Sequence, residues 1–140
     1  MHPPLDKRVF DKEASFLSAN SFDVTHIAPG DEKTWIQNGV RIITYKARVG
    51  ILGRVLQLKK LFNLARSIDA DVYHCNEVDS WLIGVLLKIK YKKYCVFDVH
   101  EHYPEDFSEM RFPVWLRPPV KLLIKIIMWI FSRFTDRIVL

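Results

Sequence analysis

The sequence predicts an α/β fold, a Rossmann-like and mostly parallel sheet with helices on both faces. Short apolar strand patterns alternate with amphipathic helix patterns along the 140-residue chain, an order typical of βαβ units. We find no tight hairpin signal between consecutive strands, which favours parallel strands joined by helical crossovers. The apolar run Tyr94–Phe97 leads into a cluster of histidines and carboxylates, as expected at the carboxyl edge of such a sheet, where ligands bind.

The expected elements follow one another along the whole chain. The helices are expected over 3–19, over 50–68, from the Asn76–Asp79 turn to Tyr91, and over about 118–134. The strands are expected over 22–27, 39–45, 71–75, 94–99 and 136–140. Cys75 and Cys95 fall inside or at the end of strands and lack zinc spacing, so we expect reduced thiols rather than a disulfide framework.

Side-chain spacing justifies the first two helices. Phe10, Ala14 and Leu17 lie four and three residues apart, so they share one face of the first helix. Pro3 and Pro4 suit its first turn, where a backbone N–H would have no helical partner. The second helix has an apolar stripe of the same kind, formed by Ile51, Val55, Leu58, Phe62 and Ala65.

Composition favours a folded domain with a mildly basic surface. Hydrophobic residues make up 49% of the chain, which is enough to form a core. The 21 Lys and Arg residues exceed the 16 Asp and Glu residues and give a net charge of +5. That charge fits a solvated surface or attraction to phosphates, a nucleotide or anionic lipid. The polar N-terminus is unlike a signal peptide, and the scattered lysines predict no nucleic-acid partner.

The segment Val99–Asp106 carries the strongest candidates for chemistry. An imidazole at the carboxyl edge of a sheet, such as His100, can hydrogen-bond a sugar hydroxyl or a phosphate, or move a proton near neutral pH. Glu101 would fix the tautomer of His100 or bind ligand hydroxyls. Alternatively, His100 is a capping or core histidine and the acids only keep the loop soluble. A metal site that uses His100 and His102 is a weaker alternative, because nothing else in the segment completes it.

A second polar cluster, His74–Ser80, follows the 71–75 strand. Parallel strands bring their carboxyl ends to one edge, so this cluster would lie near His100 if the two strands are neighbours. Asn76 and Asp79 are candidates for ligand contact. The alternative is that one of them only caps the helix that follows.

Residues 112–134 combine aromatic, basic and apolar side chains. The contact candidates are Trp115, Lys121, Lys125, Trp129 and Arg133. Apolar residues cover most of the circumference of the expected helix, which favours a surface for an anionic membrane or another domain over a helix buried only against the sheet. The apolar stretch Val120–Phe131 is too short, and with its two lysines too charged, to span a membrane.

Three blocks of the sequence resemble the N-terminal domain of family 4 glycosyltransferases of the GT-B architecture, in the family's order and at its spacing. The blocks are His2–Ala14, Asp71–Ser80 and Phe97–Glu105. The resemblance covers essentially the whole chain. It implies that residues 1–140 form a single acceptor-side domain of a retaining glycosyltransferase.

The resemblance also implies an activity and its partners. Such enzymes have two Rossmann-like domains that face a cleft, and they transfer a hexose from a nucleotide-sugar to a glycan or lipid-linked acceptor, often in polysaccharide biosynthesis. They need no metal or other cofactor. Many attach to the membrane through basic, aromatic surfaces, which implies a cytoplasmic location, peripheral on the inner face of the cytoplasmic membrane.

Site residues follow from the matched positions. His100 matches the histidine that contacts the transferred sugar near its reacting carbon, and Glu101 is its companion, so these two are the implied catalytic residues. The implied substrate-binding residues are His2, Asp6, Arg8, Asn76 and Asp79.

The sequence departs from the family pattern at both ends. Met1 directly precedes His2, where the family has an apolar strand that lies between the strands expected at 22–27 and 71–75. The chain ends at Leu140, before the C-terminal donor-binding domain and its paired glutamates. We therefore expect an incomplete domain that is inactive alone. The alternative is a non-catalytic membrane- or partner-docking α/β module; a flavodoxin-like signalling domain fits less well, because the acidic cluster after a first strand is absent.

Overall fold

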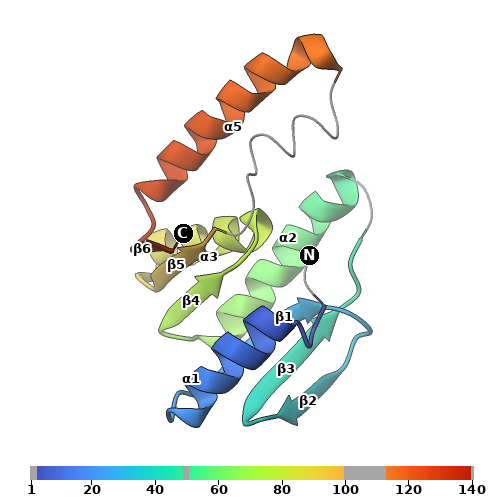
Figure 1. Cartoon of the computed structure of the whole chain (residues 1–140), viewed down its shortest axis with the longest axis vertical. Coiled ribbons are helices and arrows are strands. Elements are labelled where there is room, and N and C mark those ends of the chain that lie inside the picture. The colour runs from blue at the N-terminus through green and yellow to red at the C-terminus, as the bar shows by residue number, and fades with distance from the viewer. Residues whose placement is uncertain (1–2, 49–50, 100–112, 140) are drawn as a thin grey trace. The chain divides into compact units, whose positions relative to one another are not determined.

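The computed structural model describes residues 3–48, 51–99 and 113–139. The chain divides into two compact units, Met1–Ile68 and Asp69–Leu140. In the described residues each unit has helices and one three-stranded sheet, so the chain is a mixed α/β protein, as predicted (Figure 1). That the two units form one Rossmann-like domain stays a prediction.

The first unit contains a mixed sheet in the order β1-β3-β2. Its elements are η1 (Lys7–Ala14), α1 (Ser15–Ala19), β1 (Thr25–Pro29), β2 (Thr34–Gln37), β3 (Val40–Tyr45) and α2 (Ile51–Ile68). β1 pairs with β3 in parallel, with Thr25 opposite Arg41, whereas β2 and β3 are antiparallel. The strand predicted over 39–45 is confirmed, and the one predicted over 22–27 is displaced towards the C-terminus.

β2 and β3 form a tight hairpin, contrary to the expectation from sequence. The two loop residues, Asn38 and Gly39, have φ angles of 52° and 76°. A type I′ turn requires positive φ at both positions, and Asn-Gly is the pair that it favours. The expectation that no tight hairpin is present was therefore wrong, and the first sheet is mixed rather than mostly parallel.

The first helical segment begins later than predicted. Asp6 is its N-cap, and the Asp6 carboxylate accepts the backbone N–H groups of Arg8 and Val9 at 2.9 and 3.0 Å. Pro3 and Pro4 precede this cap, so placing them in the first turn was wrong. The helix starts where a side-chain oxygen can satisfy its first free N–H groups.

The core of the first unit joins η1 to the sheet. Its buried members are Phe10, Ala14, Val40 and Ile42, with Val24 and Trp35 packed against them. The apolar stripe predicted for α2 was partly wrong, because Val55 is 56% exposed whereas Gln57 is buried. The Gln57 side-chain oxygen accepts the Arg48 N–H at 2.7 Å. Apolar periodicity does not anticipate a polar side chain that turns inward to a backbone donor.

The second unit contains a parallel sheet in the order β4-β5-β6. Its elements are β4 (Val72–Cys75), α3 (Val78–Tyr91), β5 (Tyr94–Asp98), η2 (Val114–Leu116), α5 (Arg117–Ser132) and β6 (Arg137–Val139). These confirm the strands and helices predicted from residue 71 onward. Cys75 and Cys95 are free and buried, which agrees with the prediction of reduced thiols.

The cap of α3 differs from the prediction. Glu77 is the N-cap, and the Ser80 hydroxyl accepts the Glu77 N–H at 3.1 Å and donates to the Glu77 carbonyl at 2.8 Å. The prediction that Asn76 or Asp79 caps the helix was wrong. Glu77 and Ser80, three residues apart, form a capping box, and this pair of contacts fixes the first residue of α3. Asp79 lies in the first turn instead, where its negative charge suits the helix dipole.

Asp136 joins the start of β6 to β5. Its carboxylate accepts the Cys95 N–H at 2.8 Å and pairs with Lys88 Nζ at 2.6 Å. Burial raises the pKa of Asp136, but the hydrogen bonds from Cys95 and Lys88 outweigh burial and hold this pKa below its ordinary value. The ionised carboxylate therefore stabilises the pairing of β6.

Trp81 of α3 is the centre of the core of the second unit. Its ring stacks on Phe97 at 4.0 Å between centroids and meets the edge of Phe131, from α5, at 5.7 Å. The Trp81 indole N–H donates to the Thr135 hydroxyl at 2.7 Å. One side chain thus ties α3 to β5, to α5 and to the segment that leads into β6, and its polar atom has a partner.

Candidate functional site

The carboxyl ends of β4 and β5 meet at one edge of the parallel sheet. Their register places His74 opposite Val96 and Cys75 opposite Phe97. Asn76 and Val99, the first residues after β4 and β5, therefore lie at this edge, as expected for two neighbouring parallel strands. In open α/β sheets this is the edge at which ligands bind.

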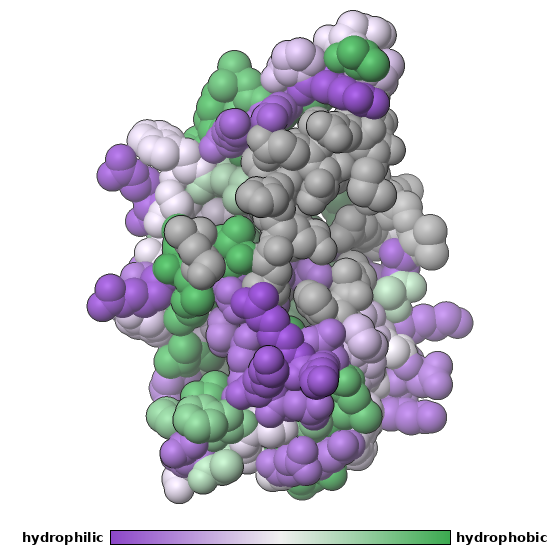
Figure 2. All heavy atoms as spheres, viewed as in Figure 1, coloured by the Kyte–Doolittle hydropathy of each residue, from purple (hydrophilic) through white to green (hydrophobic). Residues whose placement is uncertain are grey.

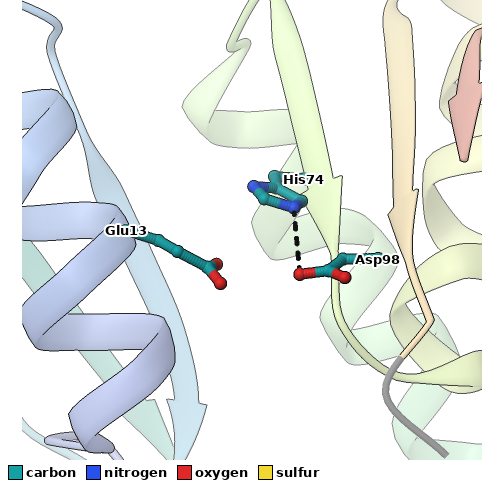
Figure 3. A group of neighbouring side chains, drawn as sticks. All are labelled: Glu13, His74 and Asp98. Atoms are coloured by element: carbon teal, nitrogen blue, oxygen red, sulfur yellow. Dashed lines mark ion pairs between the residues drawn. The ribbon is translucent and has the colours of Figure 1, made fainter. Parts of the chain in front are cut away.

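His74 and Asp98 face each other at this edge (Figure 3). The distance between His74 Nε2 and Asp98 Oδ2 is 3.9 Å, which is an ion-pair contact when the imidazole is protonated. Asp98 is only 2% exposed, whereas 36% of the His74 side chain is accessible. A buried carboxylate beside an accessible imidazole can orient the ring and leave it available to a ligand.

Asn76 contributes an amide oxygen that has no hydrogen-bond partner among the described residues. The side-chain Oδ1 of Asn76 is buried and finds no hydrogen bond within the part of the chain that the structure describes. A buried acceptor without a donor costs about 1–3 kcal/mol. A ligand hydroxyl or N–H that enters the site could satisfy this oxygen, so Asn76 suits a ligand that brings a hydrogen-bond donor.

Cys75 is the last residue of β4 and is buried in the core of the second unit, so it is not a candidate nucleophile. Its hydrogen bond with Cys95 and its burial raise the pKa of the Cys75 thiol well above the ordinary value. The nucleophilic form of cysteine is the thiolate. Cys75 is therefore a packing residue that supports the edge.

The other predicted site residues fall into three groups. His2, His100 and Glu101 lie outside the described residues, so their roles stay predictions. Asp6 and Arg8 lie in the first unit, where Asp6 caps η1 and Arg8 Nε is 3.5 Å from Glu13 Oε1. Asn76 and Asp79 lie in the second unit, where Asn76 is between β4 and α3 and Asp79 is in the first turn of α3.

The predicted contact residues lie on η2, on α5 and at Arg133, the C-cap of α5. Trp115 is 76% exposed and Trp129 is 60% exposed. Arg133 lies over the Trp129 ring, with Cζ 4.9 Å from the centroid. Lys121 is half-buried and Lys125 is exposed. Of the helices in the described ranges, none has the length and apolarity that a membrane crossing requires.

Two polar residues were missed by the sequence analysis. Asp98 is the last residue of β5, and an acid at the end of an otherwise apolar strand is the signal that marks it. His26 lies in β1, and its Nε2 is buried without a hydrogen bond to any described residue. Burial lowers the pKa of His26, against the opposing effects of Asp6 and of the Pro4 carbonyl. Nothing in the sequence around His26 distinguishes it from a solvent-exposed strand residue.

Lowering the pH should destabilise the first unit through His26. Its folded-state pKa lies below the ordinary value of 6.5, so below pH 6.5 the unfolded chain binds a proton that the folded chain does not. The free energy of unfolding should therefore fall as pH drops from 6.5 towards the lowered pKa, and this contribution should be constant above 6.5. Urea unfolding of the parent and His26→Gln across this range measures the effect. A pH dependence that His26→Gln leaves unchanged would contradict the assignment.

The second unit thus holds an imidazole, a buried carboxylate and an unpaired amide oxygen at one sheet edge. Their donors and acceptors suit a ligand that carries several hydroxyl groups. In comparisons with known proteins, no protein-family model matches the chain, and no curated protein matches it either.

Proposed function

We propose that the chain is the acceptor-side, N-terminal half of a retaining glycosyltransferase of the GT-B architecture. The whole enzyme would transfer a sugar from a nucleotide-sugar to a glycan or lipid-linked acceptor in the cytoplasm. The observation that carries the proposal is the buried Oδ1 of Asn76, which has no hydrogen-bond partner among the described residues and lies two positions after His74, at the ligand-binding edge of a parallel sheet. Sugar hydroxyls both donate and accept, so they satisfy an amide oxygen and an imidazole at once.

Strand order lends further support to the proposal. β1 is one of the two edge strands of the first sheet, and β4 is one of the two edge strands of the second sheet. These are the two strands that the family resemblance places on either side of its first strand. A single Rossmann-like sheet would result if a further strand paired with both, and that sheet is part of the proposal.

His100 and Glu101 would carry the chemistry in the whole enzyme. His100 would contact the transferred sugar while positive charge develops at its anomeric carbon, and Glu101 would orient polar contacts. In a protein that carries both domains, His100→Ala should lower the rate of transfer by about a hundredfold or more, because it removes a group placed at the developing charge. Nearly unchanged transfer would remove this role from His100.

The experiment that tests the function uses the 140-residue chain and two ligand sets, nucleotide-sugars and acceptor oligosaccharides. We expect glycan binding at the β4–β5 edge, no detectable sugar transfer, and no nucleotide-sugar binding. Asn76→Ala should weaken glycan binding by about two- to tenfold, because a neutral hydrogen bond is lost. NMR titration measures the binding of glycans and of nucleotide-sugars. Asn63→Ala, at an exposed position of α2, is the matched control. Turnover by the chain alone, or glycan affinity that Asn76→Ala leaves unchanged, would overturn the proposal.

A second candidate function is a non-catalytic docking module. The observation that favours it is the large exposed apolar surface of α5. The same titrations distinguish the two functions, because a docking module should show no response to glycans at His74 or Asn76.

A further inference from the structure

Two atoms of types that bind metals face each other at the β4–β5 edge without a hydrogen bond between them. His74 Nε2 and Asp98 Oδ2 are directed at each other (Figure 3), and their separation of 3.9 Å is too long for a hydrogen bond. Two atoms that bind one zinc ion at about 2.0–2.2 Å lie about 3.4 Å apart at the tetrahedral angle, so a movement of about 0.5 Å would bring both onto one ion. Of the His74 side chain 36% is accessible, which leaves room for this movement.

Asn76 adds a third such atom at the same level of the sheet. Cys75 lies opposite Phe97, so the next residues along the two chains are Asn76 and Asp98. The backbone is still extended at Glu77, with φ −137° and ψ 154°. Because side chains alternate along an extended chain, position 76 lies on the same face of the sheet as position 74. Asn76 Oδ1 is buried and has no hydrogen-bond partner among the described residues.

All three atoms offer lone pairs to a common partner. An unprotonated imidazole nitrogen, a carboxylate oxygen and an amide oxygen are acceptors, and none of them can donate a hydrogen bond to another. A cation satisfies three acceptors at once, whereas a neutral ligand has to bring a separate hydrogen-bond donor to each. Asp98 is only 2% exposed, and a buried carboxylate is stabilised by a positive charge beside it.

We propose that His74, Asn76 and Asp98 bind a divalent transition-metal ion, with Zn²⁺ as the best match. Water would complete the coordination, because three protein ligands and one water are typical of an open zinc site. All three residues belong to the second unit. The site takes a ligand class that the glycosyltransferase resemblance does not imply, and it does not depend on the proposed function.

The set of ligand atoms favours Zn²⁺ over harder cations. Imidazole nitrogen suits zinc, whereas Mg²⁺ and Ca²⁺ prefer oxygen ligands throughout. Cys75 and Cys95 are softer ligands than any of the three residues, but both thiols lie in the buried core around Trp81. Zinc could reach them only if this core opened, so the ion should bind at the sheet edge.

Isothermal titration calorimetry of the 140-residue chain, without a histidine tag and after treatment with EDTA, tests the site. We expect one Zn²⁺ ion to bind per chain, and Mg²⁺ not to bind at the same concentrations. His74→Ala should weaken Zn²⁺ binding by more than about a hundredfold, since losing a group that only orients a metal ligand already costs about 10–100-fold. Asn76→Ala should weaken it by about tenfold or more. In NMR spectra the ring signals of His74 should shift with Zn²⁺, and those of His26 should not.

Matched control variants separate the site from weak binding elsewhere. Figure 2 shows hydrophilic side chains on many parts of the visible face, so scattered weak binding of a cation is expected. His26→Gln removes an imidazole from the first unit, and Asp23→Asn removes an exposed carboxylate from it. Cys75→Ala with Cys95→Ala removes both buried thiols. All three variants should bind Zn²⁺ as the parent does.

Three results would overturn the zinc site. The first is the absence of saturable binding of one Zn²⁺ per chain. The second is binding that His74→Ala and Asn76→Ala leave unchanged, and the third is binding that is lost when the two thiols are removed. Far-UV circular dichroism checks that each variant is folded, and Asn76→Ala provides the test if His74→Ala is not. Glycan titrations with EDTA present decide the proposed function separately from the zinc site.

Discussion

Replacing Trp81 by alanine should lower the free energy of unfolding by about 3–5 kcal/mol, the loss typical of removing a large buried aromatic side chain. Trp81 is 1% exposed and contacts Phe97 and Phe131 through two different ring geometries. The substitution would leave a cavity where α3, β5 and α5 meet. Urea unfolding followed by far-UV circular dichroism measures the loss.

Two variants show whether the loss comes from packing at this position. Trp81→Phe keeps an aromatic ring but removes the N–H that donates to Thr135, so it should cost less, on the order of 1 kcal/mol for the hydrogen bond. Trp129→Ala removes the same side chain from an exposed position and should change stability by no more than about 0.5 kcal/mol. If Trp81→Ala and Trp129→Ala were equally stable, the core assignment would be wrong.

Gly84→Ala in α3 should destabilise the chain by about 1–3 kcal/mol, the usual cost of overpacking. A Cβ at this position would lie 2.7 Å from Cys75 Sγ and 2.8 Å from Cys95 Sγ, closer than such atoms approach. Helix propensity alone predicts the opposite sign, because alanine is favoured over glycine within a helix by about 1 kcal/mol. The sign of the change in the urea midpoint therefore distinguishes close packing from local propensity.

A double-mutant cycle assigns this effect to the two sulfur atoms. Cys75→Ala with Cys95→Ala removes both sulfurs and opens space over Gly84. In that background Gly84→Ala should cost much less, with a favourable coupling energy of about 1 kcal/mol or more. A cost that is equal in both backgrounds would mean that the thiols do not limit the approach of α3 to the sheet.

Local pattern predicted most elements, because each is encoded by residues near in sequence. The strands around Val40–Tyr45 and Tyr94–Asp98 and the helix α5 follow from apolar spacing within single segments. The β2–β3 hairpin is also encoded by residues near in sequence, because Asn38-Gly39 is a strong turn signal. The expectation that no tight hairpin is present overlooked this signal. The first residue of α3 is set by the contact between Glu77 and Ser80. The sequence analysis missed this pair because Asn76 and Asp79, close by, are also typical N-cap residues.

The candidate site was only partly accessible from sequence. The turn at Asn76 was predicted because polar residues follow a short apolar strand, and the functional roles of His100 and Glu101 stay predictions. Asp98 was missed because its burial and its approach to His74 depend on how β4 pairs with β5. The unpaired state of Asn76 Oδ1 depends on every neighbouring atom, and no spacing rule reports it.

By itself, the sequence determined the α/β class, the reduced state of the cysteines and the basic, aromatic character of residues 113–134, because these depend on composition and short-range periodicity. Only the tertiary structure decided that the strands form two separate three-stranded sheets. It also decided which side of α5 is covered, and that His74 and Asp98 face each other. The physical reason is that burial and pairing arise from contacts between segments distant in sequence, and these contacts select among patterns that are locally equivalent.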